Sequence, residues 1–197
     1  MILVTPVLIG LLVPTVTLDS TTVSAKGYHF PLAAGSTGTV SEDGTRVQYL
    51  KPDTSLYFTS TAYDKEMRKE MKKYKGSGDL TITTDNYMEI MELIYLYPDE
   101  FSGRNITYTG FVYNEPGHDG YQFLFRFGII HCIADSGVYG LLTTGNATSY
   151  PNNTWITATG TISLEYDKTL EQNLPVLNIS KIKETDAPDN PYVYRVF

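Results

Sequence analysis

Glycine recurs inside the apolar and β-branched stretches in the second half of this chain. Gly110, Gly128, Gly140 and Gly160 each lie within a run of strand-forming residues, where an ordinary strand would carry a side chain. Glycine weakens a straight strand and is typical of sharp bends and of points where two backbones approach closely. This pattern predicts a small, strongly curved β structure.

Five stretches have the composition of β-strands, and turn signals separate some of them. They are Asn105 to Asn114, Tyr121 to Ala134, Gly137 to Thr144, Trp155 to Glu165, and Leu174 to Ile182. Together with the internal glycines they predict a mainly β, α+β fold with one or two helices, built around an OB-like five-stranded barrel. An open β-sandwich is the alternative.

Two segments before these strands have helical patterns. Ala62 to Tyr74 carries charges and methionines at helical spacing and is followed by Gly76-Ser77-Gly78, which favours a helix end. Asn86 to Leu96 follows a short strand at Leu80 to Thr84 and has one apolar face. The Thr-, Ser- and Gly-rich segment from Leu18 to Leu56 predicts loop with one or two strands, such as Thr45 to Leu50.

The first residues, Met1 to Val16, carry no charge. As a helix they would extend about 24 Å, against a hydrocarbon layer of about 30 Å. No basic residue precedes the run, so a secretory signal peptide fits poorly. We expect the exit half of a transmembrane helix or a short anchor, with a buried core segment as the alternative. The expected organisation is residues 1–17 as membrane segment, 18–78 as linker and helix, and 79–197 as the β domain.

Charge and cysteine content exclude some classes of function. The chain has a formal net charge of -7, which opposes binding to phosphate backbones, so no nucleic-acid partner is expected. The basic residues between Lys65 and Lys75 alternate with acidic ones at helical spacing and indicate a solvated helix face. The single cysteine, Cys132, excludes an internal disulfide framework.

The densest group of reactive side chains lies between two predicted strands. His131, Cys132 and Asp135 fall within five residues, and a turn at Ser136-Gly137 could bring them together around a soft or borderline metal such as zinc. The alternative is that Cys132 is an ordinary buried residue and that Asp135 caps the turn.

Arg126 is an isolated charge among apolar strand residues. It could bind an anionic ligand or form an internal ion pair, of which the ion pair is favoured. The sequence contains neither a Gly-x-Ser-x-Gly elbow nor a phosphate-binding glycine loop with its lysine, and its carboxylates are scattered. We therefore expect no enzymatic activity.

Several longer motifs resemble the YcgQ-like family of bacterial permease subunits. They are LLVPTVTLDSTTVSAKG at 11–27, YPDEFSGRNITYTGFVY at 97–113, the block from Phe125 to Leu142, Trp155 to Gly160, and PDNPYVY at 188–194. The resemblance implies that the apolar start ends a transmembrane helix, that the β domain lies outside the cytoplasm, and that the partner is a multi-span permease. It also implies a link to metal-ion homeostasis. Where such proteins have a Cys-Cys pair before Ala-Asp, this chain has His131-Cys132.

These observations lead to one functional expectation and one alternative. We expect a non-catalytic accessory subunit of a membrane permease, located in the cell membrane, whose extracytoplasmic β domain binds a partner or ligand. The alternative is a metal-binding module that uses the region of His131, Cys132 and Asp135.

Overall fold

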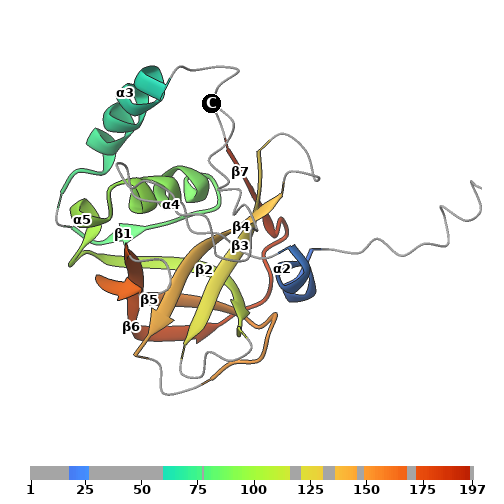
Figure 1. The fold of residues 1–197 in the computed structure, drawn as a ribbon. Coiled ribbons are helices and arrows are strands. Elements are labelled where there is room, and N and C mark those ends of the chain that lie inside the picture. The colour runs from blue at the N-terminus through green and yellow to red at the C-terminus, as the bar shows by residue number, and fades with distance from the viewer. Residues whose placement is uncertain are drawn as a thin grey trace, which may run out of the picture.

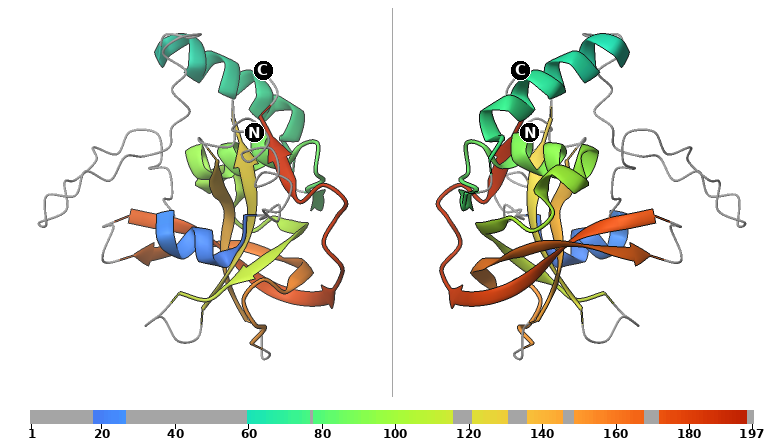
Figure 2. Two further views of the ribbon diagram at one scale, coloured as in Figure 1. Left: turned by 90° about the vertical axis from the view of Figure 1, so that its right-hand side faces the viewer. Right: turned by 90° about the vertical axis from the view of Figure 1, so that its left-hand side faces the viewer.

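A β barrel with helices stacked on one end forms the body of the protein. The computed structural model describes residues 18–26, 60–76, 78–115, 121–130, 136–145, 149–167 and 172–195. Helix α4 (Tyr87–Leu96) covers one end of the barrel, and α3 (Ser60–Met71) lies beyond it (Figures 1 and 2). The short helix α2 (Ser20–Lys26) lies against the side of the barrel (Figure 1).

Five strands form the barrel. They are β2 (Asn105–Tyr113), β3 (Gln122–Ile129), β4 (Gly137–Thr144), β5 (Trp155–Asp167) and β6 (Gln172–Glu184). Their hydrogen bonds close a ring in the order β2, β5, β6, β4, β3 and back to β2. Only the β4–β6 pair in this ring is parallel. The order β5, β2, β3, β4 is that of a Greek key. The mainly β prediction is therefore confirmed as a closed five-stranded barrel, and the open sandwich is excluded.

The predicted strand bounds agree well with the observed ones, except in β3. The predicted and observed bounds of β4 coincide. For β2, β5 and β6 no end is more than two residues from the predicted one. The prediction extended β3 to Ala134, whereas β3 ends at Ile129. Within the described residues, the ladder between β3 and β4 stops at the Gly128–Gly137 pair.

The four strand glycines lie at positions that a larger residue would not fit. A Cβ added to Gly110 would lie 2.7 Å from the carbonyl oxygen of Phe125. A Cβ on Gly140 would overlap the carbonyl of Leu124, and one on Gly160 the carbonyl of Asn178. At Gly128 the obstacle is side-chain packing by Met88 and Tyr139. Glycine is thus needed where neighbouring strands approach most closely, as the sequence pattern indicated.

Helix α4 is buried almost all round, although the sequence predicted a single apolar face. Nine of its ten residues are buried. The barrel covers its inner side, and Tyr63 and Met67 of α3 are buried against the same core. Because α4 is the middle layer between barrel and α3, its outer face is apolar as well.

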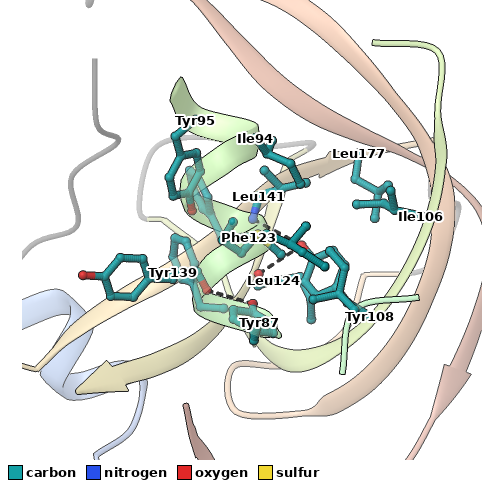
Figure 3. Packing of buried hydrophobic residues seen from close by; sticks show 14 of the residues in the cluster. Tyr87, Ile94, Tyr95, Ile106, Tyr108, Phe123, Leu124, Tyr139, Leu141 and Leu177 are labelled. Carbon is teal, nitrogen blue, oxygen red and sulfur yellow. Dashed lines mark hydrogen bonds between the residues drawn. The ribbon is translucent and has the colours of Figure 1, made fainter. Parts of the chain in front are cut away.

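Three tyrosine hydroxyls bond this core to the main chain of β3 and β4, and Figure 3 draws the bonds of Tyr87 and Tyr108. Tyr87 of α4 donates to the Tyr139 carbonyl (2.9 Å), Tyr95 of α4 donates to the Gly140 carbonyl (2.6 Å), and Tyr108 of β2 donates to the Leu124 carbonyl (3.2 Å). All three tyrosines are buried, so each hydroxyl requires such a partner.

The smaller elements differ more from the sequence predictions. The predicted helix at 62–74 is observed as α3 followed by the 3-10 turn η2 (Lys72–Tyr74), and the predicted strand at 80–84 shortens to β1 (Leu80–Thr81). The helix α5 (Pro98–Phe101) and the strand β7 (Tyr192–Tyr194) were not predicted.

The first part of the chain needs one correction. Helix α2 replaces the loop or strand predicted there, because Asp19 caps it and Val23 is buried in the core. The predicted strand at Thr45 to Leu50 and the apolar start, Met1 to Val16, lie outside the described residues. Among the helices that are described, none combines the length and apolarity needed to cross a bilayer.

The close approach at Gly160 leads to a stability prediction. Gly160→Ala forces a methyl group onto the Asn178 carbonyl, so β5 and β6 must separate, and we expect a loss of about 2–3 kcal/mol in the free energy of unfolding. The matched control is Gly78→Ala, where no atom lies within 4 Å of the added Cβ. Urea denaturation of both variants measures the difference, and equal stabilities would contradict the packing described here.

Candidate functional site

The predicted metal ligands, His131, Cys132 and Asp135, lie outside the described residues. The structure therefore leaves that prediction untested. Within the described ranges there is no group of three or more His, Cys, Asp or Glu side chains that could hold a metal ion. The ends of the segment are described: Gly128 of β3 pairs with Gly137 of β4, so residues 129–136 connect two paired strands.

Arg126 projects from β3 into a buried site beneath the C-terminal segment. Its Nη2 donates to the carbonyls of Asn190 (2.8 Å) and Tyr192 (3.4 Å), and its Nε donates to that of Pro191 (3.4 Å). Its Nη1 donates to the hydroxyl of Thr84 (2.9 Å). The guanidinium thus ties the residues before β7 to the barrel.

Aromatic rings complete the surroundings of Arg126. The guanidinium carbon lies 5.6 Å from the ring centre of Tyr87 and 5.9 Å from that of Trp155. Burial lowers the pKa of Arg126, although an arginine stays charged at physiological pH. No carboxylate of the described residues forms an ion pair with it; carbonyl dipoles and ring faces stabilise the charge instead. The ligand-binding role of Arg126 stays a prediction.

A second buried polar cluster joins three separate segments. Glu92 of α4 accepts a hydrogen bond from the Tyr63 hydroxyl of α3 and forms an ion pair with Arg195, with Nη2 and Oε2 2.9 Å apart. The side chains of Arg195 and Glu92 are only 7% and 11% exposed. The cluster therefore fastens α3 and the C-terminal end to α4.

The pKa values in this cluster follow from burial. Desolvation raises the pKa of Glu92, while Arg195 and the Tyr63 hydroxyl partly oppose the rise. Burial, together with the charge of Glu92, raises the pKa of Tyr63 well above its usual value. Tyr63 is therefore protonated and donates at any physiological pH. With its oxygens occupied by Tyr63 and Arg195, Glu92 is placed for a structural role and not for acid–base chemistry on a substrate.

A third buried charge plays a similar part. Arg104, just before β2, donates from Nη1 to the carbonyl of Tyr74 (2.6 Å) and from Nη2 to that of Gly78 (3.4 Å). Its guanidinium lies 5.2 Å from the ring centre of Phe101. It holds the connection between η2 and β1 against the barrel.

Sequence reasoning missed most of these contacts. Glu92 lies in the middle of the apolar run YMEIMELIYL, which also contains Glu89, and an acid at such a position is a signal that the side chain has a buried partner. Nothing in the sequence identifies Tyr63 and Arg195 as those partners, because they lie 29 residues before and 103 residues after Glu92.

Comparisons with known proteins identify relatives along the whole chain. Residues 57–195 match the model of the DUF1980 C-terminal domain, and residues 1–29 match that of the DUF1980 N-terminal domain. A protein of Streptococcus mutans serotype c (strain ATCC 700610 / UA159), named as a subunit of a two-component membrane permease complex, is 71% identical over all of this chain and 73% of its own length. UPF0703 protein YcgQ of Bacillus subtilis (strain 168) is 39% identical over 98% of this chain and 66% of its own length.

The predicted resemblance to YcgQ-like proteins is therefore confirmed. Among solved structures, the asparaginyl-tRNA synthetase from Pyrococcus horikoshii aligns with 47% of this chain and 23% of its own, at 13% identity and a TM-score of 0.27. That score is too low to bear on fold or function.

The cluster around Glu92 leads to a pH-dependent prediction. Tyr63→Phe removes a hydrogen bond to a buried carboxylate, and we expect a loss of about 2 kcal/mol at neutral pH. Folded Glu92 holds its proton to higher pH than unfolded Glu92, so its contribution to stability is full below about pH 4.5 and declines as the pH rises through the raised pKa. Without the Tyr63 hydroxyl the pKa of Glu92 is higher still, so the stability gap between variant and wild type widens as the pH rises above about 4.5.

Denaturation at several pH values measures this gap. The control is Tyr166→Phe, because Tyr166 is 62% exposed and its hydroxyl can bond water, so a change within about 0.5 kcal/mol is expected. A Tyr63→Phe gap that stays constant or narrows as the pH rises would show that Glu92 is not the partner.

Proposed function

The chain belongs to the DUF1980 family, and from this premise we propose that it is a non-catalytic accessory subunit of a membrane permease. The observation that carries the proposal is the 71% identity, over the whole chain, to a protein named as a subunit of such a complex. The apolar start is proposed as its membrane segment and the barrel as a domain outside the cytoplasm that binds a partner or ligand.

The buried charges support a binding role over a catalytic one. Arg104, Arg126 and the Glu92–Arg195 pair each hold a peripheral segment against the barrel or α4. They bond to main-chain carbonyls, to the hydroxyls of Thr84 and Tyr63, or to each other, so these residues stabilise a shape. A rigid barrel whose peripheral segments are held in place suits a domain that binds other molecules at its surface.

We propose that the barrel is OB-like. A closed five-stranded barrel containing a Greek key is the architecture of that fold, which commonly serves as a binding module. The proposed organisation is residues 1–17 as the membrane segment, 18–78 as linker and helix, and 79–197 as the β domain. The charge of -7 supports a partner other than nucleic acid.

The paired ends of the β3–β4 connection favour a second candidate, a metal-binding module. Because Gly128 pairs with Gly137, the short connection must reverse the chain, and His131, Cys132 and Asp135 all fall within it. Such a loop can bring soft and borderline ligands together around zinc, which would agree with a role in metal-ion homeostasis. Titration of the purified protein with zinc tests this: about one equivalent bound by the wild type and a marked loss in Cys132→Ser is expected, whereas equal binding would leave Cys132 as a packing residue.

Co-purification tests the leading proposal. The full-length protein, extracted from membranes in mild detergent, is expected to elute with a multi-span membrane protein in a fixed ratio, identified by mass spectrometry. A variant lacking residues 1–17 serves as the control and should lose that partner, because the apolar segment makes the contact within the bilayer. Recovery of the full-length chain in the soluble fraction, or as a monomer without partner, would contradict the proposal.

A further inference from the structure

Helix α2 is docked firmly on the barrel although it follows directly on the apolar start. We propose that this docking fixes the barrel's orientation, so that the side carrying α2 lies against the lipid headgroups and the side carrying α5 faces away. The inference rests on the proposed membrane segment at residues 1–17. It adds what the proposed function does not specify, namely which surface of the domain faces the bilayer.

Three hydrogen bonds attach α2 to different parts of the barrel. The backbone nitrogen of Leu18 donates to the Tyr192 hydroxyl of β7 (3.2 Å), and that of Ser20 donates to the side-chain oxygen of Asn153 (2.8 Å). The Ser24 hydroxyl lies 3.4 Å from that of Tyr113, at the end of β2. Contacts to β7, β2 and the β4–β5 connection prevent α2 from pivoting on the barrel.

Apolar burial and capping add to these bonds. Val23 of α2 is only 1% exposed and belongs to the barrel's core cluster. Burial of this apolar side chain stabilises the docked position of α2. The Asp19 carboxylate accepts hydrogen bonds from the backbone nitrogen (3.0 Å) and hydroxyl (2.6 Å) of Thr21, which starts the helix at a defined residue.

The chain length between membrane and barrel is the next constraint. The apolar start is expected to end at Val16, the first charged residue is Asp19, and Leu18 is already bonded to the barrel. Since a chain spans at most about 3.6 Å per residue, Leu18 lies within about 7 Å of Val16, where the proposed membrane segment leaves the hydrocarbon. The headgroup region is about 5–8 Å deep on each side of a bilayer. The barrel surface around Leu18 must therefore lie at or beside the headgroups.

Surface chemistry agrees with this orientation. Of the α2 residues whose burial is described, Thr21, Ser24 and Ala25 are exposed, and all three are small and uncharged; the Asp19 carboxylate caps the helix on this side. On the other side of the barrel, α5 exposes Asp99 and Glu100 (Figure 1). In a chain with a net charge of -7, anionic lipids repel the acidic side and leave the α2 side free to approach.

Fluorescent labels on two parts of the protein test the orientation. In a Cys132→Ser background of the full-length chain, a cysteine is introduced either at Asn152, beside the α2 contact Asn153, or at Glu100 on α5; both positions are exposed. Each variant is labelled with an environment-sensitive dye and reconstituted into phosphatidylcholine–phosphatidylglycerol vesicles that contain quencher lipids. We expect quenching at position 152 to exceed that at position 100 several-fold.

A matched variant tests whether α2 causes the orientation. Asn153→Gly combined with Tyr192→Phe removes the two hydrogen bonds that hold the start of α2, and glycine adopts the positive φ of position 153 without strain. The difference in lipid quenching between positions 152 and 100 should then become small. An unchanged contrast, equal quenching in the parent protein, or stronger quenching at position 100 would each overturn the inference.

Flotation of the same vesicles separates this inference from the proposed function. If the protein does not float with the lipid, the membrane segment itself is wrong. If it floats and the labels show no contrast, the membrane segment stands and only the orientation is wrong. If the dye at position 152 is shielded from water but is not quenched by the lipids, a second copy of the chain covers this side, which also overturns the inference.

Discussion

The closed barrel depends on the approach of main chain to main chain at three glycines. At Gly110, Gly140 and Gly160 the carbonyl of a neighbouring strand occupies the space that a Cβ would need. This approach lets strands of eight to thirteen residues bend enough to form a ring of only five. The tyrosine hydroxyls of α4 and β2 then bond to the same region of β3 and β4, so the helical layer depends on the glycine contacts as well.

Outside the barrel, buried arginine side chains hold the short peripheral segments in place where large apolar contacts are absent from the described structure. Arg104 holds the chain before β1, Arg126 the chain before β7, and Arg195 joins the C-terminal end to α4. A guanidinium carries five donors, so one side chain can bind several carbonyls of an irregular segment that has no sheet partner. This explains how short elements such as β1 and β7 keep fixed positions. It also accounts for these buried charges by structural contacts.

The sequence predicted the barrel much better than its attachments. Strand composition and internal glycine are local signals, and they located all five barrel strands, with β3 too long. The apolar run of α4 predicted a helix, but not that Glu92 within it would meet Tyr63 and Arg195, since those contacts arise only from the packing of distant segments. Arg126 was recognised as unusual, yet its partners are backbone carbonyls, which every residue carries and no sequence pattern reveals. The loop with His131, Cys132 and Asp135 stays a prediction.

The contact between Leu18 and Tyr192 has a consequence for biosynthesis. These residues are 174 positions apart, so one end of the described chain is held by the other. A ribosome releases the chain from its N-terminal end, and early segments must wait for late partners. Helix α2 therefore cannot complete its docking until the last few residues have been made. The bond between Leu18 and Tyr192, next to the proposed membrane segment, would therefore form last, after the contacts of α2 with Asn153 and Tyr113.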